Sequence, residues 1–298
     1  MDRLDAMHAY VRVVESGSFS AVARELGASQ SAVSKQVAAL EKHLGTRLLS
    51  RTTRALALTD EGRVYFESAQ RIVADAREAE SQLRAGALNV TGRLRVGASV
   101  AFGRLVLFDA VHSFMQAHPQ LQVDLHLADG FVDIVSEGLD LAVRIGELAD
   151  SSLLAQRVGT TRRAVVASRA YVDALPDRLA LPLVPADLSL HECIVYSGLA
   201  TQNVWVFEHA DGPIAVRVAG RLSSNSSELV REAVCAGMGL GFSPTWLFAD
   251  ELASGRVLRL LPGYEPQPLP IHVVYPASRR HARKVVAFAE HVREVLSV

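Results

Sequence analysis

The sequence predicts an α/β protein with a small helical head, one long connecting helix and a larger α/β body. Three observations support this prediction. Residues 1–58 repeat apolar side chains at three- and four-residue spacing, residues 59–88 repeat them at a 3.5-residue period, and residues 89–298 alternate strand-like runs with helical stretches. With 298 residues, of which 49% are hydrophobic and 21% charged, the chain can bury a sizeable core.

Charge is unevenly distributed along the chain. The total is −1, which argues against a uniform nucleic-acid coat or a membrane-surface protein. Residues 1–58, however, carry eight basic and five acidic side chains, whereas residues 59–88 and 89–298 each carry a net charge of −2. A basic head on a faintly acidic body favours a nucleic-acid contact confined to the head.

Other features of composition point to the cytoplasm. The two cysteines, Cys193 and Cys235, match neither a disulfide framework nor a metal motif, and they favour buried thiols over a redox pair. The polar N-terminus lacks the apolar stretch of a signal peptide, and the longest uncharged run, 233–249, is too short and too rich in glycine to span a membrane. We therefore expect a soluble, cytoplasmic protein without a membrane partner.

The head predicts three helices. The first carries an apolar stripe, and the second is capped by Ser18 and ends at Gly27. The third begins near Ser29 and ends at Gly45, so a tight turn separates two short helices in the helix-turn-helix pattern. The stripe of the first helix consists of Leu4, Met7, Tyr10, Val11 and Val14.

Polar residues on the third helix suggest DNA contacts. No acid occurs between Ser29 and Glu41, and short hydroxyls, amides and one lysine can reach base edges and phosphates. An ordinary solvated helix face remains the alternative. The segment 47–58, a basic turn between strand-like runs, has the pattern of a wing and favours DNA binding over an ordinary solvated face. The candidate DNA-binding residues are Ser29, Gln30, Ser31, Ser34, Lys35, Arg51, Thr52, Thr53 and Arg54.

The order of these motifs resembles the winged helix-turn-helix head of LysR-type transcriptional regulators. The matching segments are 18–20, 31–36, 40–41, 44–45, 48–54 and 58–62. The resemblance implies that Ser31, Ser34 and Lys35 face bases or phosphates, and that Arg51 and Arg54 hold the wing on the DNA backbone.

The connecting helix begins at Thr59, a hydroxyl cap followed by two acids. Its 3.5-residue period predicts a two-stranded coiled coil, although a surface helix with a chance seam remains open. In the family this segment pairs two subunits, which implies a homodimer or homotetramer on an inverted-repeat operator in double-stranded DNA, with RNA polymerase as a further candidate partner. The candidate dimerisation residues are Tyr65, Ala69, Ile72, Ala76, Ala79 and Leu83.

The body predicts a parallel sheet flanked by helices. Strands are expected around 94–98, 121–127 and 140–145, with helices at 102–117 and 131–138 between them. Further strands are expected at 164–167, 193–195, 204–207, 214–218 and 271–275, and helices at 226–236 and near 279–296.

Several stretches of the body are similar to the LysR-type effector-binding domain, namely 92–97, 118–119, 140–146, 167–168, 236–241 and 243–244. The resemblance implies a two-lobed, periplasmic-binding-protein-like fold with a small-molecule effector in the cleft. By this analogy lobe one comprises 91–161 and 268–298, and lobe two comprises 162–267.

The resemblance also implies the cleft residues. Ser99 and the N–H groups after it could hold an anion or carboxylate, whereas Asp129 in the cleft would oppose one. Arg144 is equally consistent with a structural or a ligand-facing role. The candidate effector-binding residues are Ser99, Val100, Ala101, Phe102, Asp129, Arg144, Gly146, Tyr196, Ser197, Thr201, Asn225, Pro244 and Thr245.

No motif favours an enzyme. The glycines at 237–241 do not fit a nucleotide loop, the histidines lack metal-ligand spacing, and no nucleophile elbow is present, so we expect no catalytic residue, metal or cofactor beyond an effector of unknown identity. The favoured function is an effector-controlled DNA-binding transcriptional regulator. The alternative is a small-molecule-binding or enzymatic α/β protein with a vestigial DNA-binding head.

Overall fold

The computed structural model describes residues 2–51, 56–84, 90–130, 132–176, 179–198, 201 and 203–296, without the side chains of residues 51, 77–79 and 81–84. Contacts divide the chain into two compact units, Met1–Gly92 and Arg93–Val298. The first unit therefore holds the head and the long helix together. Its elements are α1 (Arg3–Ser16), α2 (Phe19–Glu25), α3 (Gln30–Leu44), the antiparallel strands β1 (Leu49–Arg51) and β2 (Leu56–Leu58), and α4 (Asp60–Arg84).

Local sequence signals set the helix ends of the first unit. Asp2, Ser18 and Ser29 cap α1, α2 and α3 by accepting a backbone N–H with their side-chain oxygens. Gly17 and Gly45 follow α1 and α3 with left-handed φ values of 64° and 71°, which glycine adopts without steric cost. The three predicted head helices are confirmed, and so is Ser18 as the cap of the second.

The long helix α4 packs against α1 of its own chain. The rings of Tyr65 and Phe66 lie 5.8 and 6.3 Å from that of Tyr10, and Ala69 is 0% exposed within the head's core. Tyr65 and Ala69 were expected at a seam between subunits, and the structure instead places them inside one subunit. Ile72, by contrast, is 46% exposed.

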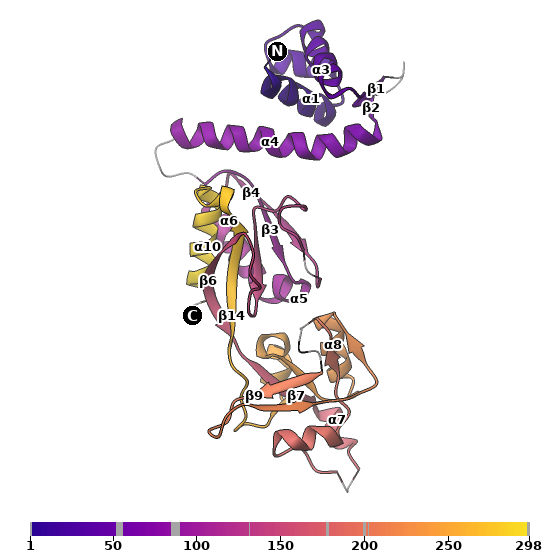
Figure 1. The fold of residues 1–298 in the computed structure, drawn as a ribbon, viewed down its shortest axis with the longest axis vertical. Coiled ribbons are helices and arrows are strands. Elements are labelled where there is room, and N and C mark those ends of the chain that lie inside the picture. The colour runs from indigo at the N-terminus through magenta and orange to yellow at the C-terminus, as the bar shows by residue number, and fades with distance from the viewer. Residues whose placement is uncertain are drawn as a thin grey trace. The chain divides into compact units, whose positions relative to one another are not determined.

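The second unit contains a five-stranded sheet, which we call lobe one. Its strand order is β4-β3-β5-β14-β6, and β3 runs parallel to β5, whereas β14 runs antiparallel to both β5 and β6. Figure 1 shows α6 and α10 beside this sheet, and the rings of Phe114 and Phe288 lie 5.2 Å apart between them. The elements are β3 (Gly92–Ala98), α5 (Val100–Phe102), the π-helical turn η1 (Gly103–Leu107), α6 (Phe108–Ala117), β4 (Leu121–Leu127), β5 (Leu141–Ile145), β6 (Leu153–Thr161), β14 (Leu269–Pro276), η4 (Ala277–Arg279) and α10 (Arg283–Leu296).

Lobe two is built on the three-stranded sheet β12-β7-β13, in which both outer strands run antiparallel to β7. Two short strand pairs, β8 with β11 and β9 with β10, complete it. The elements are β7 (Arg163–Ser168), α7 (Arg169–Asp173), η2 (Pro185–Leu190), β8 (Val195–Tyr196), β9 (Val204–Phe207), β10 (Ile214–Arg217), β11 (Ser223–Ser224), α8 (Ser227–Cys235), β12 (Gly241–Pro244), η3 (Thr245–Phe248), α9 (Ala249–Ala253) and β13 (Val257–Leu260).

Three expectations for the body require correction. The sheet of lobe one is mixed, because β14 returns from lobe two and runs antiparallel to its neighbours. The expected helix at 131–138 is a single turn over the described residues 132–138, since the Asp133 carboxylate accepts the Val135 N–H at 2.9 Å and Val135 points to solvent. Cys193 forms only an isolated bridge to Leu240, and the strand begins at Val195.

Candidate DNA-binding and effector-binding sites

Helix α3 has a buried and an exposed face. Val33, Val37 and Leu40 are fully buried in the core of the head, whereas Ser31 and Lys35 are exposed. These two exposed residues are four positions apart and therefore share one side of the helix. Because the buried face fixes α3 in the head, the side chains of its exposed face hold a fixed orientation relative to the rest of the head.

The rest of the exposed face is polar and basic. Ser29 and Gln30 are exposed at the N-terminus of α3, Ser34 is half-buried, and Lys42 is exposed seven residues after Lys35 on the same side. A helix N-terminus with hydroxyl and amide groups offers hydrogen-bond donors to phosphates and base edges.

Glu41 is the one acid in this part of the sequence, and it has a structural role. Its carboxylate Oε1 accepts the backbone N–H groups of Leu48 and Leu49 at 2.9 and 3.0 Å. The acid therefore fixes the start of β1 to the end of α3. Sequence reasoning did not assign this role, because the contact depends on a chain reversal at Gly45.

The predicted wing exists as the β1–β2 pair. Thr59 closes its base, since its hydroxyl donates to the Arg47 carbonyl at 2.7 Å and its N–H donates to the Leu48 carbonyl at 3.1 Å. The candidate DNA-binding residues Thr52, Thr53 and Arg54 lie outside the described residues, as does the side chain of Arg51.

The turn after β3 carries the first effector-site candidates. Ser99 occupies the cap position of α5 without a side-chain cap bond, and the Val100 N–H donates to the Asp129 carboxylate at 3.1 Å. The expected anion cradle therefore already faces a carboxylate of the protein. A ligand carboxylate at this turn would be repelled by Asp129.

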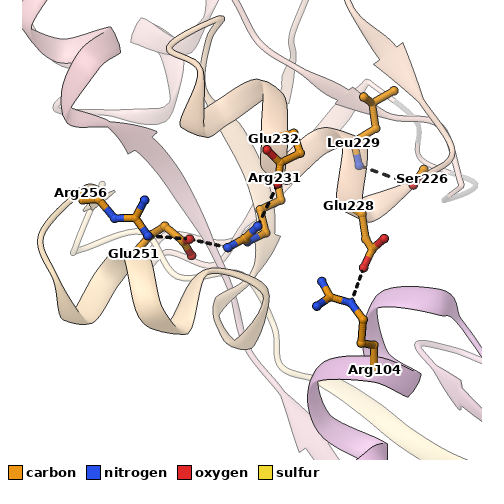
Figure 2. A network of polar contacts seen from close by, with 8 residues as sticks. All are labelled: Arg104, Ser226, Glu228, Leu229, Arg231, Glu232, Glu251 and Arg256. Atoms are coloured by element: carbon orange, nitrogen blue, oxygen red, sulfur yellow. Dashed lines mark hydrogen bonds and ion pairs between the residues drawn. The ribbon is translucent and has the colours of Figure 1, made fainter.

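The next two candidates hold the lobes together. Ala101 is 1% exposed and packs in the core of lobe two, and Phe102 is fully buried with its ring 5.5 Å from that of Trp246. An ion pair between Arg104 of η1 and Glu228 of α8, at 2.7 Å, spans the lobes beside them (Figure 2). In this conformation the side chains of Ala101 and Phe102 form interlobe packing rather than an open ligand surface.

Tyr196 of lobe two lies near Asp129 of lobe one. Burial raises the pKa of Tyr196, its hydrogen bond with Ser227 lowers it, and the charge of Asp129 raises it further. The structure thus brings Ser99, Val100, Asp129 and Tyr196 to one place, where the C-terminal ends of β3 and β8 meet. Three residues near this place, Ser227, Arg104 and Glu228, were not predicted from the sequence as part of the site.

Arg144 and Gly146 lie at the end of β5. The Arg144 guanidinium donates to the Val132 carbonyl at 2.9 Å, and burial lowers its pKa. This contact favours the structural role for Arg144. Gly146 is buried with a φ of 106°, and its N–H donates to the Pro270 carbonyl at 2.9 Å, so it ties the turn that follows β5 to the paired strand β14.

The remaining candidates belong to lobe two. Ser197, Thr201 and Asn225 are exposed, and the Ser197 N–H donates to the Ser224 carbonyl at 2.8 Å. Pro244 ends β12 and Thr245 begins η3, and both are half-buried next to the crossing from β6 to β7.

A pocket of about 200 Å³ lies elsewhere in lobe two, beside Cys235. The buried Glu251 in its wall takes ion pairs from Arg231 and Arg256 (Figure 2), so its carboxylate serves an internal network. Within the described part of the chain, no cluster of three metal-ligating side chains occurs, and no helix is long and apolar enough to cross a membrane.

Comparisons with known proteins match both units. Residues 88–297 match the LysR substrate binding domain, and residues 4–63 match the bacterial regulatory helix-turn-helix proteins of the lysR family. The HTH-type transcriptional regulator PtxR of Pseudomonas aeruginosa is 37% identical over 293 residues, which cover 98% of this chain and 93% of that protein. The HTH-type transcriptional regulator DmlR of Escherichia coli is 34% identical over 292 residues, which cover 98% and 94%.

A solved structure extends the match to the fold of the whole chain. CrgA, a LysR-type transcriptional regulator from Neisseria meningitidis, is 30% identical with a TM-score of 0.61, and the alignment covers 98% of each chain. The alignment therefore extends over the head, the long helix and the two-lobed body of this chain. The chain belongs to the LysR family of transcriptional regulators, with a helix-turn-helix DNA-binding domain and a C-terminal effector-binding domain.

Proposed function

We propose that this chain controls transcription as a homodimer, or as a homotetramer of two such dimers, bound to an inverted-repeat operator in double-stranded DNA. A small molecule between the two lobes changes the affinity for DNA or the bending of the operator, and RNA polymerase is a further partner at the promoter. The chain acts through binding rather than through catalysis.

The observation that carries the DNA part is the composition of the exposed face of α3. Ser31, Lys35 and Lys42 share one side of the helix, and the nearby acid Glu41 is occupied by two backbone N–H groups of the wing. A face of hydroxyls and lysines without an opposing acid attracts the phosphate backbone. Ser29, Gln30, Ser34 and the wing extend that face.

Dimerisation supplies the second head. Residues 1–58 carry a net charge of only +3, so one head makes few phosphate contacts. On α4 the inner side packs on the chain's own head, whereas Val64 and Ile72 are 71% and 46% exposed. We assign the partner-facing side of α4 to Ile72 and Ala76, together with Ala79 and Leu83, whose side chains lie outside the described residues.

The effector part rests on the interlobe contacts. Asp129 and Tyr196 come from different lobes and lie near each other, Asp129 accepts the N–H of Val100 next to Ser99, and the pair Arg104–Glu228 spans the lobes. A molecule bound between these groups would contact both lobes and thereby favour one lobe arrangement over another. A ligand can shift an equilibrium only by such a difference in affinity between the two states.

The test is a titration of random and promoter duplex DNA with the full chain at several salt concentrations. We expect Lys35→Ala to weaken binding and to reduce the slope of log K against log salt by roughly one unit per lost phosphate contact, with one such contact per head. The matched control is Arg221→Ala, which removes one positive charge from an 86% exposed side chain of lobe two.

Equal slopes for the wild type and Lys35→Ala would show that Lys35 touches no phosphate. Absent or salt-independent binding by the wild type would instead favour the alternative of an α/β binding protein or enzyme with a vestigial head. Such a protein needs neither the acid-free face of α3 nor the long helix α4.

A further inference from the structure

Arg163 lies at the edge of lobe two where the chain crosses from lobe one. It is the first residue of β7, directly after the crossing strand β6, and it pairs with Pro244 in the register of β7 and β12. The carbonyl of its neighbour Arg162 accepts the Thr245 N–H at 3.0 Å. Arg163 therefore lies among two of the residues proposed to line the effector site.

The side chain of Arg163 is held by aromatic rings. Its guanidinium carbon lies 4.5 Å from the centroid of the Phe242 ring, and Phe242 in turn stacks on Trp205 at 5.1 Å with an interplanar angle of 24°. A ring face attracts a cation by about 0.5–2 kcal/mol but accepts no hydrogen bond in the plane of the guanidinium. The aromatic pair thus orients the guanidinium without occupying the donors of its two terminal nitrogens.

No carboxylate or carbonyl among the described residues pairs with Arg163. Its Nε is buried without a hydrogen-bond partner, whereas neither of its two terminal nitrogens is both buried and unpaired. Three other partly buried arginines of the same unit have an acceptor: Arg144 has the Val132 carbonyl, Arg231 has Glu251, and Arg95 has Asp124. Even the exposed neighbour Arg162 pairs with Glu265 at 3.2 Å.

An unpaired and partly buried charge is unfavourable, because desolvation is not offset by an opposite charge. Burial also lowers the pKa of Arg163. A planar anion would remove this cost, since a guanidinium binds a carboxylate through two parallel hydrogen bonds. The turn at Ser99 cannot provide an equivalent site, because Asp129 already accepts the Val100 N–H.

We propose that Arg163 anchors the effector by binding a carboxylate group, and that the effector turns a hydrogen-bond donor, such as a hydroxyl, toward Asp129. This assignment rests on the proposed effector site between the lobes. It places the anionic end of the ligand on lobe two, the opposite of what the helix start at Ser99 alone suggests. The effectors are then hydroxycarboxylates rather than neutral molecules or amines.

The test uses the full chain and a panel of aliphatic and aromatic hydroxycarboxylates, each matched with its primary amide at constant ionic strength. Thermal shift identifies the compounds that bind, and calorimetric titration gives their Kd. We expect at least one hydroxycarboxylate to bind while its amide does not. Arg163→Gln should weaken that binding at least tenfold, and Arg163→Lys, which keeps the charge but loses the two-pronged donor, should weaken it less.

Arg162→Gln is the matched control, because it removes the adjacent arginine, which is 67% exposed and paired with Glu265. It should leave the Kd within twofold. An unchanged midpoint of unfolding by tryptophan fluorescence in each variant shows that the second unit, which contains both tryptophans, is intact.

Three results would overturn the proposal: binding of amides as tight as that of acids, equal affinity of wild type and Arg163→Gln, or no binding by any acid of the panel. The DNA titration described above separates these outcomes from a failure of the proposed function, because operator binding by the ligand-free chain does not depend on Arg163.

Discussion

Two tyrosines that contact each other in the first unit make opposite predictions for the same substitution. The hydroxyl of Tyr10 on α1 donates to the Gly62 carbonyl on α4 at 2.7 Å, and Tyr10 is 0% exposed. The hydroxyl of Tyr65, whose ring lies 5.8 Å away, is buried without a partner among the described residues. Replacing each tyrosine with phenylalanine removes one oxygen atom from nearly the same environment.

The expected magnitudes follow from the hydrogen bonds. Tyr10→Phe loses one buried hydrogen bond, with a net contribution of about 1 kcal/mol. The loss should not be larger, because the Gly62 carbonyl lies in the first turn of α4 and also accepts a helical hydrogen bond. Tyr65→Phe removes a desolvated, unpaired hydroxyl and should leave the unit unchanged or stabilise it by up to about 1 kcal/mol.

Calorimetry and far-UV circular dichroism of the full chain measure the difference. For a unit of this size, about 1 kcal/mol corresponds to a shift in Tm of roughly 4–8 °C. Both tryptophans, Trp205 and Trp246, belong to the second unit, so tryptophan fluorescence follows that unit alone and serves as an internal control. A Tyr65→Phe variant as destabilised as Tyr10→Phe would refute the reasoning, as would a shift of the fluorescence midpoint in either variant.

Three further predictions concern the dimer, a buried ion pair and pH. Ile72→Lys places a charge on the exposed side of α4 and should lower dimerisation in sedimentation experiments; an unaltered profile would remove Ile72 from the seam. Asp140→Asn removes the buried carboxylate charge that pairs with Arg279 at 3.2 Å and lies 3.6 Å from Lys284, and it should destabilise the second unit by about 3–5 kcal/mol in urea unfolding. A loss below about 1 kcal/mol would contradict the buried pair. Burial lowers the pKa of His191 below its usual value near 6.5. Between the two pKa values this histidine is therefore protonated in the unfolded chain and neutral in the folded chain. The stability of the second unit should therefore be complete above pH 6.5 and fall below it, and His191→Gln should reduce that fall; equal pH dependence in both proteins would exclude His191 as a source.

The parts of the fold that sequence predicted are those set by local interactions. Ser18 and Ser29 cap their helices through oxygens only three residues from the N–H groups that they accept, so spacing alone identifies them. The strand β6 was not predicted, because its side chains do not alternate clearly and its partner β14 is more than a hundred residues away in sequence. Long-range pairing of this kind leaves little signal in one sequence.

The same distinction holds for the sites. The polar face of α3 could be predicted from short motifs, and the turn at Ser99 from the resemblance to the LysR-type effector-binding domain. The inward packing of Tyr65 and Ala69 could not, because a 3.5-residue period does not say whether the partner is another subunit or the chain's own head. A role for Arg163 could not be predicted either, because the feature that distinguishes it is a buried Nε without a hydrogen-bond acceptor, which only the folded structure shows.

In vitro selection from a random duplex library with the full chain tests the central claim most directly. A dimer that presents two α3 helices should enrich sequences with an inverted repeat whose half-sites are one helical turn, about 10–10.5 base pairs, or a multiple of it apart. Enrichment should decline steeply as salt is raised. A library that shows no enrichment, or that yields single half-sites bound by one chain, would contradict the account of a dimeric, operator-binding regulator.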